Sequence, residues 1–131
     1  MLRIDSTLDP ATEQVMHECI GCAVAVHRAL GPGYLESVYR RAMKLEVVAH
    51  ELECDEERRF DVRYRGEVVG QQRVDLNVQG LVVLELKAVD QVHDVHISQL
   101  ASYLHGTGLR AGLLINFRVP LLKHGLRRVV R

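Results

Sequence analysis

The sequence predicts an α/β fold in which helices flank a mixed β-sheet, with its elements in the order ααβββαββ. Three observations lead to this expectation. Apolar residues recur at helical spacing before residue 50 and again over residues 93–105. Residues 53–64 and 68–78 instead alternate polar and apolar side chains between turn signals, which is typical of strands. The apolar run over residues 111–117 then predicts a buried strand.

The bulk composition is that of an ordinary globular domain. The chain has 131 residues, of which 47% are apolar, so residues 1–131 are expected to form a single domain with one core. Lys plus Arg equals Asp plus Glu at 17 each, which gives zero net charge. Proteins that neutralise many phosphates usually carry a basic excess. The balance disfavours nucleic-acid binding without excluding it, because an acidic metal site offsets basic patches elsewhere.

The sequence also predicts where the protein works. The first residues lack the apolar region of a secretory signal, and no apolar run approaches the roughly 20 residues that span a bilayer. We therefore expect a cytoplasmic protein with no membrane association and with its three cysteines reduced. Cys19 and Cys22 have zinc-like spacing, but they fall inside an amphipathic helix without a second pair. Packing is expected for both, with a metal or redox role as the alternative.

Three helices can be placed by their ends. Asp9-Pro10 starts the first, with Asp9 as N-cap and Pro10 at the first helical position, and Gly31-Pro32-Gly33 ends it. The second is expected over residues 35–49 and the third over residues 93–105. The core-facing residues expected from the spacing are, helix by helix, Val15, Cys19, Ala23, Val26 and Leu30; Val38, Ala42, Leu45 and Ala49; Ile97, Leu100, Ala101 and Leu104.

Strands are expected between the second and third helices. Residues 53–64 and 68–78 alternate, and the turn signals Arg65-Gly66 and Gln79-Gly80 join them and the next strand into an antiparallel meander. An edge strand is expected over residues 125–130. In the second strand of the meander one face is expected to hold Val74, Leu76 and Val78, and the other Arg73, Asp75 and Asn77.

Residues 81–88 form the strand on which the functional interpretation depends. Strand side chains alternate, so Glu85 and Lys87 share a face with Leu81 and Val83, and the opposite face is wholly apolar. A strand that is apolar on both faces is expected at the centre of a sheet. Burying a carboxylate and an ammonium there is costly unless both are well paired. The pair therefore indicates a chemical site.

Asp75 completes a constellation with that pair. Counting outward from the Gln79-Gly80 turn places Asp75 and Glu85 nearly opposite each other on neighbouring strands, where Cβ atoms are about 5 Å apart. Two such carboxylates repel unless a cation lies between them, and Mg²⁺ suits a site with one or two carboxylates. Lys87 would then orient a water or stabilise charge on a phosphate. The alternative is an ordinary ion-paired sheet face.

At this point the sequence resembles a known family. Asp75, Glu85 and Lys87, set across a hairpin that follows a helix, resemble the signature of the PD-(D/E)XK nuclease-like superfamily. More narrowly, GYLESVY at residues 33–39 resembles the Gly-x-x-Glu-x-x-Tyr motif that names the GxxExxY protein family, and residues 99–103 and 112–117 fit its later segments. The resemblance covers nearly the whole chain. One departure is that Val74, not Pro, precedes Asp75, a position where Pro is commonly replaced.

The resemblance implies a restriction-endonuclease-like core that binds Mg²⁺, with Mn²⁺ as a substitute, and that acts on nucleic acid. Asp75 and Glu85 would be metal ligands, with Glu36 as an additional acidic ligand from the preceding helix. Lys87 would be the catalytic lysine, and Gln99 would join it at the site. The residues expected to contact substrate are Tyr103, Tyr39, His96 and Arg73.

Several of these residues have a simpler interpretation. A carboxylate at Glu36 suits the first turn of any helix, and helical tyrosines are more often core residues. His93 and His96 could suggest a metal site but lack a third ligand. Arginine pairs are candidate phosphate contacts or merely solvated faces: Arg40-Arg41, Arg58-Arg59 and Arg127-Arg128.

Two functions remain open from the sequence. The first is a Mg²⁺-dependent nuclease, and the second is a catalytically weak module with the same fold that binds nucleic acid or a partner protein. The neutral charge favours the second, whereas the intact Glu85 and Lys87 favour the first. The sequence does not choose between DNA and RNA. A homodimer is expected only if both strands of a duplex are cut.

Overall fold

A computed structural model describes residues 7–56 and 58–131. Three α-helices, seven strands and one short 3₁₀ helix are present among these residues. In chain order they are α1 (Pro10–Leu30), α2 (Glu36–Ala49), β1 (Cys54–Glu56), β2 (Arg59–Tyr64), β3 (Glu67–Arg73), β4 (Leu76–Val78), β5 (Val82–Lys87), α3 (Asp94–Thr107), β6 (Ala111–Asn116), η1 (Leu122–Gly125) and β7 (Leu126–Val130).

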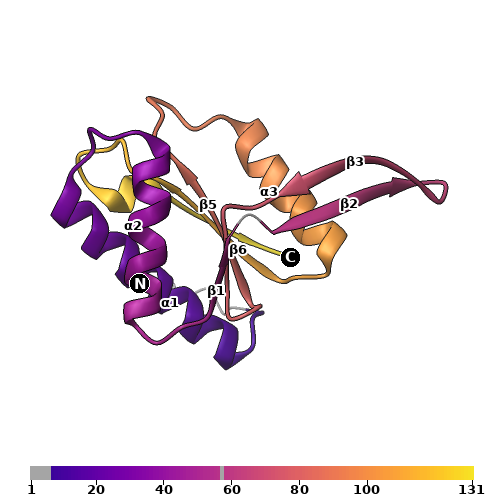
Figure 1. The fold of residues 1–131 in the computed structure, drawn as a ribbon, viewed down its shortest axis with the longest axis horizontal. Helices are drawn as coiled ribbons and strands as arrows, with labels where there is room; N and C mark the ends of the chain where they lie inside the picture. Colours follow the sequence, from indigo (N-terminus) through magenta and orange to yellow (C-terminus); the bar gives the residue numbers. More distant parts are fainter. Residues whose placement is uncertain (1–6, 57) are drawn as a thin grey trace.

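The main sheet has five strands in the order β1-β4-β5-β6-β7, and β5 lies at its centre. The β5–β6 pair is parallel and the other pairs are antiparallel, so the sheet is mixed. Helices α1 and α2 cover one face, while α3 covers the other (Figure 1). This architecture is that of a restriction-endonuclease-like fold and confirms the predicted class.

The alternation of β5 is as predicted. Val82, Leu84 and Leu86 are fully buried in the core under α1 and α2, and Val83 is buried in the smaller core under α3. Glu85 and Lys87 therefore lie on the α3 face. The turn before this strand is also as predicted, because Gln79 and Gly80 have φ of 58° and 65°, which is the left-handed conformation of a tight hairpin turn.

The predicted three-stranded meander is wrong in its connections. Residues 53–64 form two strands, β1 and β2, and residues 67–78 form two more, β3 and β4. The β2–β3 hairpin is a separate two-stranded sheet that extends away from the body alongside α3 (Figure 1). The break at Val74 and Asp75 reverses the face, so Val74 packs under α3 and not with Leu76 and Val78.

The core-facing stripe predicted for α2 is also wrong. Val38 and Leu45 are exposed, as is Ala49, and the buried residues are Tyr39, Met43 and Val47. Both stripes have helical spacing, so periodicity could not separate them. Tertiary contact decides, because the ring of Tyr39 stacks on Phe117 at the end of β6 with centroids 4.3 Å apart. Of the predicted stripe, Ala42 alone packs on the core.

In α3 the prediction holds for Leu100 and Leu104, which are buried, and for Ile97, which is half-buried, but Ala101 is exposed. Tyr103 is buried in its place, at 2% exposure. Phe60 of the β2–β3 hairpin packs edge-on against this tyrosine, with centroids 6.2 Å apart. The hairpin thus covers a part of α3 outside the predicted core-facing set.

The first helix agrees with the sequence. Asp9 accepts a hydrogen bond from the Thr12 backbone N–H, and Gly31 follows the last residue. Cys19 and Cys22 are fully buried in the core, which confirms packing, and burial raises the pKa of their thiols to about 12 and about 11. Within the described residues, no helix has the length and apolar character needed to cross a bilayer.

Candidate active site

Asp75 and Glu85 lie close together at the start of β4. Leu76 pairs with Leu84, so extending the antiparallel register by one step places Asp75 opposite Glu85, as predicted. Asp75 lies just outside β4 and its Oδ2 accepts a hydrogen bond from the Leu86 backbone N–H at 2.8 Å. The side chain thus takes the place of a main-chain acceptor for β5. This contact fixes one carboxylate against the backbone beside the other.

The electrostatics of Glu85 reflect this arrangement. Burial raises its pKa, and the hydrogen bond and the charge of Asp75 raise it further, to about 8 from an ordinary value of 4.5. The ammonium of Lys87 lowers the pKa of Glu85, but its effect is smaller. Two carboxylates that cannot both ionise comfortably form a site with affinity for a cation. Lys87 is half-buried two residues further along the same face of β5.

Arg40 is a site residue that the sequence interpretation treated only as a candidate phosphate contact. Its Nε lies 3.4 Å from Oδ1 of Asp75, and the two side chains are 28% and 16% exposed. Arg40 lies one helical turn after Glu36 in α2, so both project toward the sheet from neighbouring positions. The i, i+4 spacing of Glu36 and Arg40 was the signal that could have identified it.

Glu36 lies in the first turn of α2, near a second group of charges. The pKa of His96 is lowered by burial, by Lys87 and by His93, and Glu36 opposes this shift, so Glu36 and Lys87 both act on the imidazole of His96. His96 Nδ1 also accepts a hydrogen bond from the His93 backbone N–H at 3.1 Å, which caps α3. The two histidines therefore form a helix cap and not a metal-binding pair.

Glu85 opens into a small cavity of about 240 Å³ on the α3 face. Its walls include Gln99, Tyr103 and Arg73, three of the residues predicted from the sequence. The pKa of Tyr103 is raised by burial and by the charge of Glu85, and Arg58 opposes the shift. The structure thus brings Gln99, Tyr103 and Arg73 together at the Glu85 carboxylate.

Tyr39 is not among them, which corrects the prediction that it contacts substrate. The side chain is fully buried. Its hydroxyl donates a 2.5 Å hydrogen bond to the Gly31 carbonyl and accepts one from the Tyr34 backbone N–H at 3.2 Å. The tyrosine of the Gly-x-x-Glu-x-x-Tyr run therefore closes the loop between α1 and α2, and only its Glu36 lies near the charged groups.

The residues fit a divalent cation in part. Asp75 and Glu85 supply oxygen ligands, and the pKa of Glu85 is raised by burial and by its carboxylate neighbour. Among the described residues no group of three or more acidic, His or Cys side chains converges, so Glu36 does not join the pair as a third ligand. Mg²⁺ often uses only one or two carboxylates and completes its shell with water and substrate phosphates. Two carboxylates are therefore sufficient for this ion.

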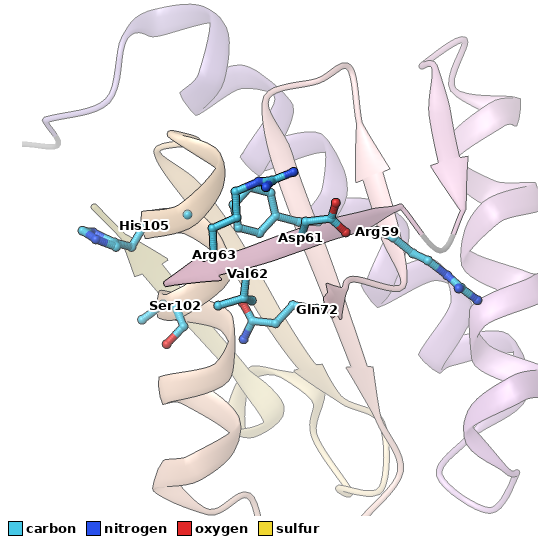
Figure 2. Close-up of a pocket in the computed structure, with 10 residues that line it drawn as sticks. Arg59, Asp61, Val62, Arg63, Gln72, Ser102 and His105 are labelled. Carbon is cyan, nitrogen blue, oxygen red and sulfur yellow. The ribbon is translucent and has the colours of Figure 1, made fainter. Parts of the chain in front are cut away.

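The β2–β3 hairpin brings positive charge to the same side. Residues 58–73 contain five Arg against one Asp and one Glu, a net charge of +3 in a chain whose total is zero. A groove of about 1030 Å³ runs between the hairpin and α3, with Arg59 and Arg63 on one side and Ser102 and His105 on the other (Figure 2).

Of the other arginine pairs considered as phosphate contacts, Arg128 instead forms an ion pair with Glu13 at 2.5 Å.

The mixed sheet, the carboxylate pair and the adjacent lysine define a nuclease-like α/β protein. A family model described as the PD-(D/E)XK nuclease superfamily matches residues 13–129. The chain belongs to this superfamily, which agrees with the resemblance of its residues. No curated protein and no solved structure gives a significant match.

Proposed function

We propose that the protein is a Mg²⁺-dependent nuclease that hydrolyses phosphodiester bonds in nucleic acid. The observation that supports this most is the placement of Asp75 opposite Glu85, with Lys87 on the same face of β5. Burial, together with the hydrogen bond and the charge of Asp75, raises the pKa of Glu85 to about 8. Membership of a nuclease superfamily supports the same conclusion.

Each residue has a distinct task in this proposal. Asp75 and Glu85 hold Mg²⁺, or Mn²⁺ in its place, through their carboxylate oxygens. When bound, such a cation acts as a Lewis acid toward the phosphodiester and lowers the pKa of a nearby water. Lys87 donates from its ammonium to that water or to a phosphate oxygen, which stabilises the charge that develops on phosphorus. Gln99 lies in the Glu85 cavity and donates from its amide to the same groups.

Substrate binding is proposed for residues around this centre. Arg73 and Tyr103 line the Glu85 cavity, and His96 lies beside Lys87 at the start of α3. The arginines of the β2–β3 hairpin supply the phosphate contacts that a neutral chain otherwise lacks. We further propose membership of the GxxExxY family, a single domain over residues 1–131 and a cytoplasmic location. A homodimer would allow cleavage of both strands of a duplex.

Cleavage of labelled DNA and RNA, single- and double-stranded, with Mg²⁺ or Mn²⁺ tests the proposal. Asp75→Asn and Lys87→Met keep the shape of the side chains and should each lower the cleavage rate by about 100-fold or more. Arg127→Met, which changes an exposed arginine on β7, is the matched control and should cleave normally. Cleavage that persists in both site variants would come from a contaminant, and the proposal would be abandoned.

A second function is favoured by one observation, namely that Glu36 does not complete a three-ligand site. On this alternative the protein binds nucleic acid or a partner protein without cutting. Calorimetry separates the two, because a binding module takes up neither Mg²⁺ nor Mn²⁺ and its Asp75→Asn variant retains partner binding. Metal binding that is lost in Asp75→Asn favours the nuclease.

A further inference from the structure

Asn77, in the middle of β4, is buried without a hydrogen-bond partner for its side-chain oxygen. Three polar residues are fully buried in the described chain: Thr12, Asn77 and Asn116. Thr12 donates to Asp9 at 2.6 Å, and Asn116 binds the backbone of Val89 through both ends of its amide. By contrast, Oδ1 of Asn77 has no donor within reach in the part of the chain that the structure describes. Its side chain is 2% exposed.

An unpartnered amide oxygen at this depth is unfavourable for folding, because it has lost water and gained nothing. Its neighbours on β4, Leu76 and Val78, are apolar, and an apolar residue would suit position 77 as well. Residues that break a local rule without a structural gain are typical of functional sites. The missing donor is therefore expected from a ligand.

The surroundings of Asn77 describe the ligand. The side chain lines a pocket of about 410 Å³ between the sheet, α3 and the start of the hairpin. Phe60 and Tyr103 form a corner of this pocket with ring planes at 69°, and Gly80 and Gly106 also line it. Arg58 and Arg59 also line it, and Arg58 makes an exposed ion pair of 3.7 Å with Asp55.

Such a set of groups matches a nucleotide. Asparagine amides recognise base edges, and aromatic rings stack on bases of any sequence. The two arginines match a phosphate, to which guanidinium groups donate two parallel hydrogen bonds. An intact duplex cannot place a base inside this pocket, because each base is stacked between its neighbours and its Watson–Crick edge is paired.

The pocket adjoins the proposed catalytic cavity. Tyr103 lines both spaces, with Glu85 in the wall of one and Arg58 in the wall of the other. We propose that the Asn77 pocket binds one unpaired nucleotide of the substrate, with its base against the Asn77 amide and its phosphate at Arg58 and Arg59. That this nucleotide belongs to the strand being cut rests on the proposed nuclease function. The preferred substrate is accordingly single-stranded or frayed.

Nucleotide binding without metal tests this directly. Nucleoside 5′-monophosphates and a single-stranded hexanucleotide are titrated in EDTA, so no cleavage occurs, and binding is followed by NMR line shifts. Asn77→Leu should weaken binding by about tenfold or more. The same variant should melt a few degrees higher, because it removes the unpartnered oxygen. Asn116→Leu is the matched control and should melt lower, since its amide is fully bonded.

Arg58→Met gives a second test that does not touch the core. It should weaken binding of the monophosphates more than that of the corresponding nucleosides, whereas Lys123→Met, at an exposed position in η1, should change neither. If Asn77→Leu melts higher but binds nucleotides as the unaltered protein does, the oxygen faced only an ordered water and the pocket proposal is overturned. Asp75→Asn should bind nucleotides normally in EDTA. If that variant still cleaves, the nuclease proposal fails while the pocket stands.

Discussion

The guanidinium Nε of Arg40 lies 3.4 Å from Oδ1 of Asp75, while Oδ2 of the same carboxylate accepts the Leu86 N–H at 2.8 Å. Asp75 is thus held from α2 by a cation and from β5 by a main-chain donor. The pKa of Glu85, the neighbour of Asp75 across the strands, is raised to about 8 by burial and by Asp75. Arg40 is therefore the positive charge that lies against the Asp75 carboxyl group.

This relationship predicts that Arg40 competes with a divalent cation. Arg40→Met should tighten Mn²⁺ binding by about three- to tenfold, because a positive charge close to the metal ligands is removed. Calorimetric titration of Mn²⁺ at fixed pH measures the effect. Arg41→Met removes the same charge from an exposed position on the same helix and should leave the affinity unchanged. Equal shifts in both variants would mean that only net charge matters.

The pKa of Glu85 predicts how stability depends on pH. Its folded value of about 8 exceeds its ordinary value of 4.5, so between these values the folded protein holds a proton that the unfolded chain has released. The contribution of Glu85 to the free energy of unfolding is therefore largest below about pH 4.5. It is lost as the pH rises toward 8. The loss should be about 2 kcal/mol, less than the whole shift implies because Glu85 is partly exposed.

Thermal melts in EDTA across this pH range measure the effect. Glu85→Gln cannot ionise and should flatten the slope. Excess Mn²⁺ should reverse the slope of stability against pH, because a bound cation favours the ionised carboxylate. Metal binding then releases a proton. Parallel slopes for Glu85→Gln and the unaltered protein in EDTA would show that Glu85 titrates normally.

Periodicity in the sequence was sufficient to predict side-chain positions where the pattern was compatible with only one arrangement. In β5 the period of two leaves one way to place Glu85 and Lys87 on a common face, and the tight turn at Gln79-Gly80 fixes Asp75 opposite Glu85. The core of the site could therefore be predicted from the sequence. The contact of Arg40 with Asp75 was not predicted, because the distance between them depends on how α2 packs on the sheet.

Other features depended on contacts between distant parts of the chain. Helix α2 has two apolar stripes. The choice between them depends on Phe117, which follows β6 and is far from α2 in the sequence. The predicted long strand breaks at Asp75 because the Leu86 backbone N–H donates its hydrogen bond to the Asp75 side chain. The burial of Tyr103 depends on Phe60 of the hairpin. None of these contacts leaves a periodic signal.

Tyr39 offers a test of the structural role assigned to the motif tyrosine. Tyr39→Phe removes a hydroxyl that donates to the Gly31 carbonyl and accepts from the Tyr34 N–H. Leaving both backbone groups unpaired should lower the free energy of unfolding by about 1–3 kcal/mol. Nucleotide and Mn²⁺ binding should not change. Urea denaturation measures the loss, and Tyr34→Phe, whose side chain is 47% exposed, should have no effect. A stable Tyr39→Phe that loses substrate affinity would restore the predicted substrate contact.

Gly106 controls how closely the β2–β3 hairpin approaches α3. A Cβ at this position would lie 2.3 Å from Cε1 and 2.8 Å from Cζ of Phe60, so an alanine must displace the ring. Replacing glycine by alanine inside a helix otherwise stabilises it by about 0.5–1 kcal/mol. Gly21→Ala in α1, where nothing lies within 4 Å, should show that gain. Gly106→Ala should not, because the displaced Phe60 ring loses its contact with Tyr103.

The displaced hairpin should be detectable as a local change. Residues 58–73 carry five Arg, so trypsin should cut Gly106→Ala in the hairpin several times faster than it cuts Gly21→Ala. Nucleotide binding at the Asn77 pocket should weaken in parallel, since Phe60 forms one of its walls. Cleavage of substrate should fall less for short oligonucleotides that reach only the Glu85 cavity. If both alanine variants raise the melting temperature equally and resist trypsin alike, Phe60 can move without cost and the hairpin does not depend on Gly106.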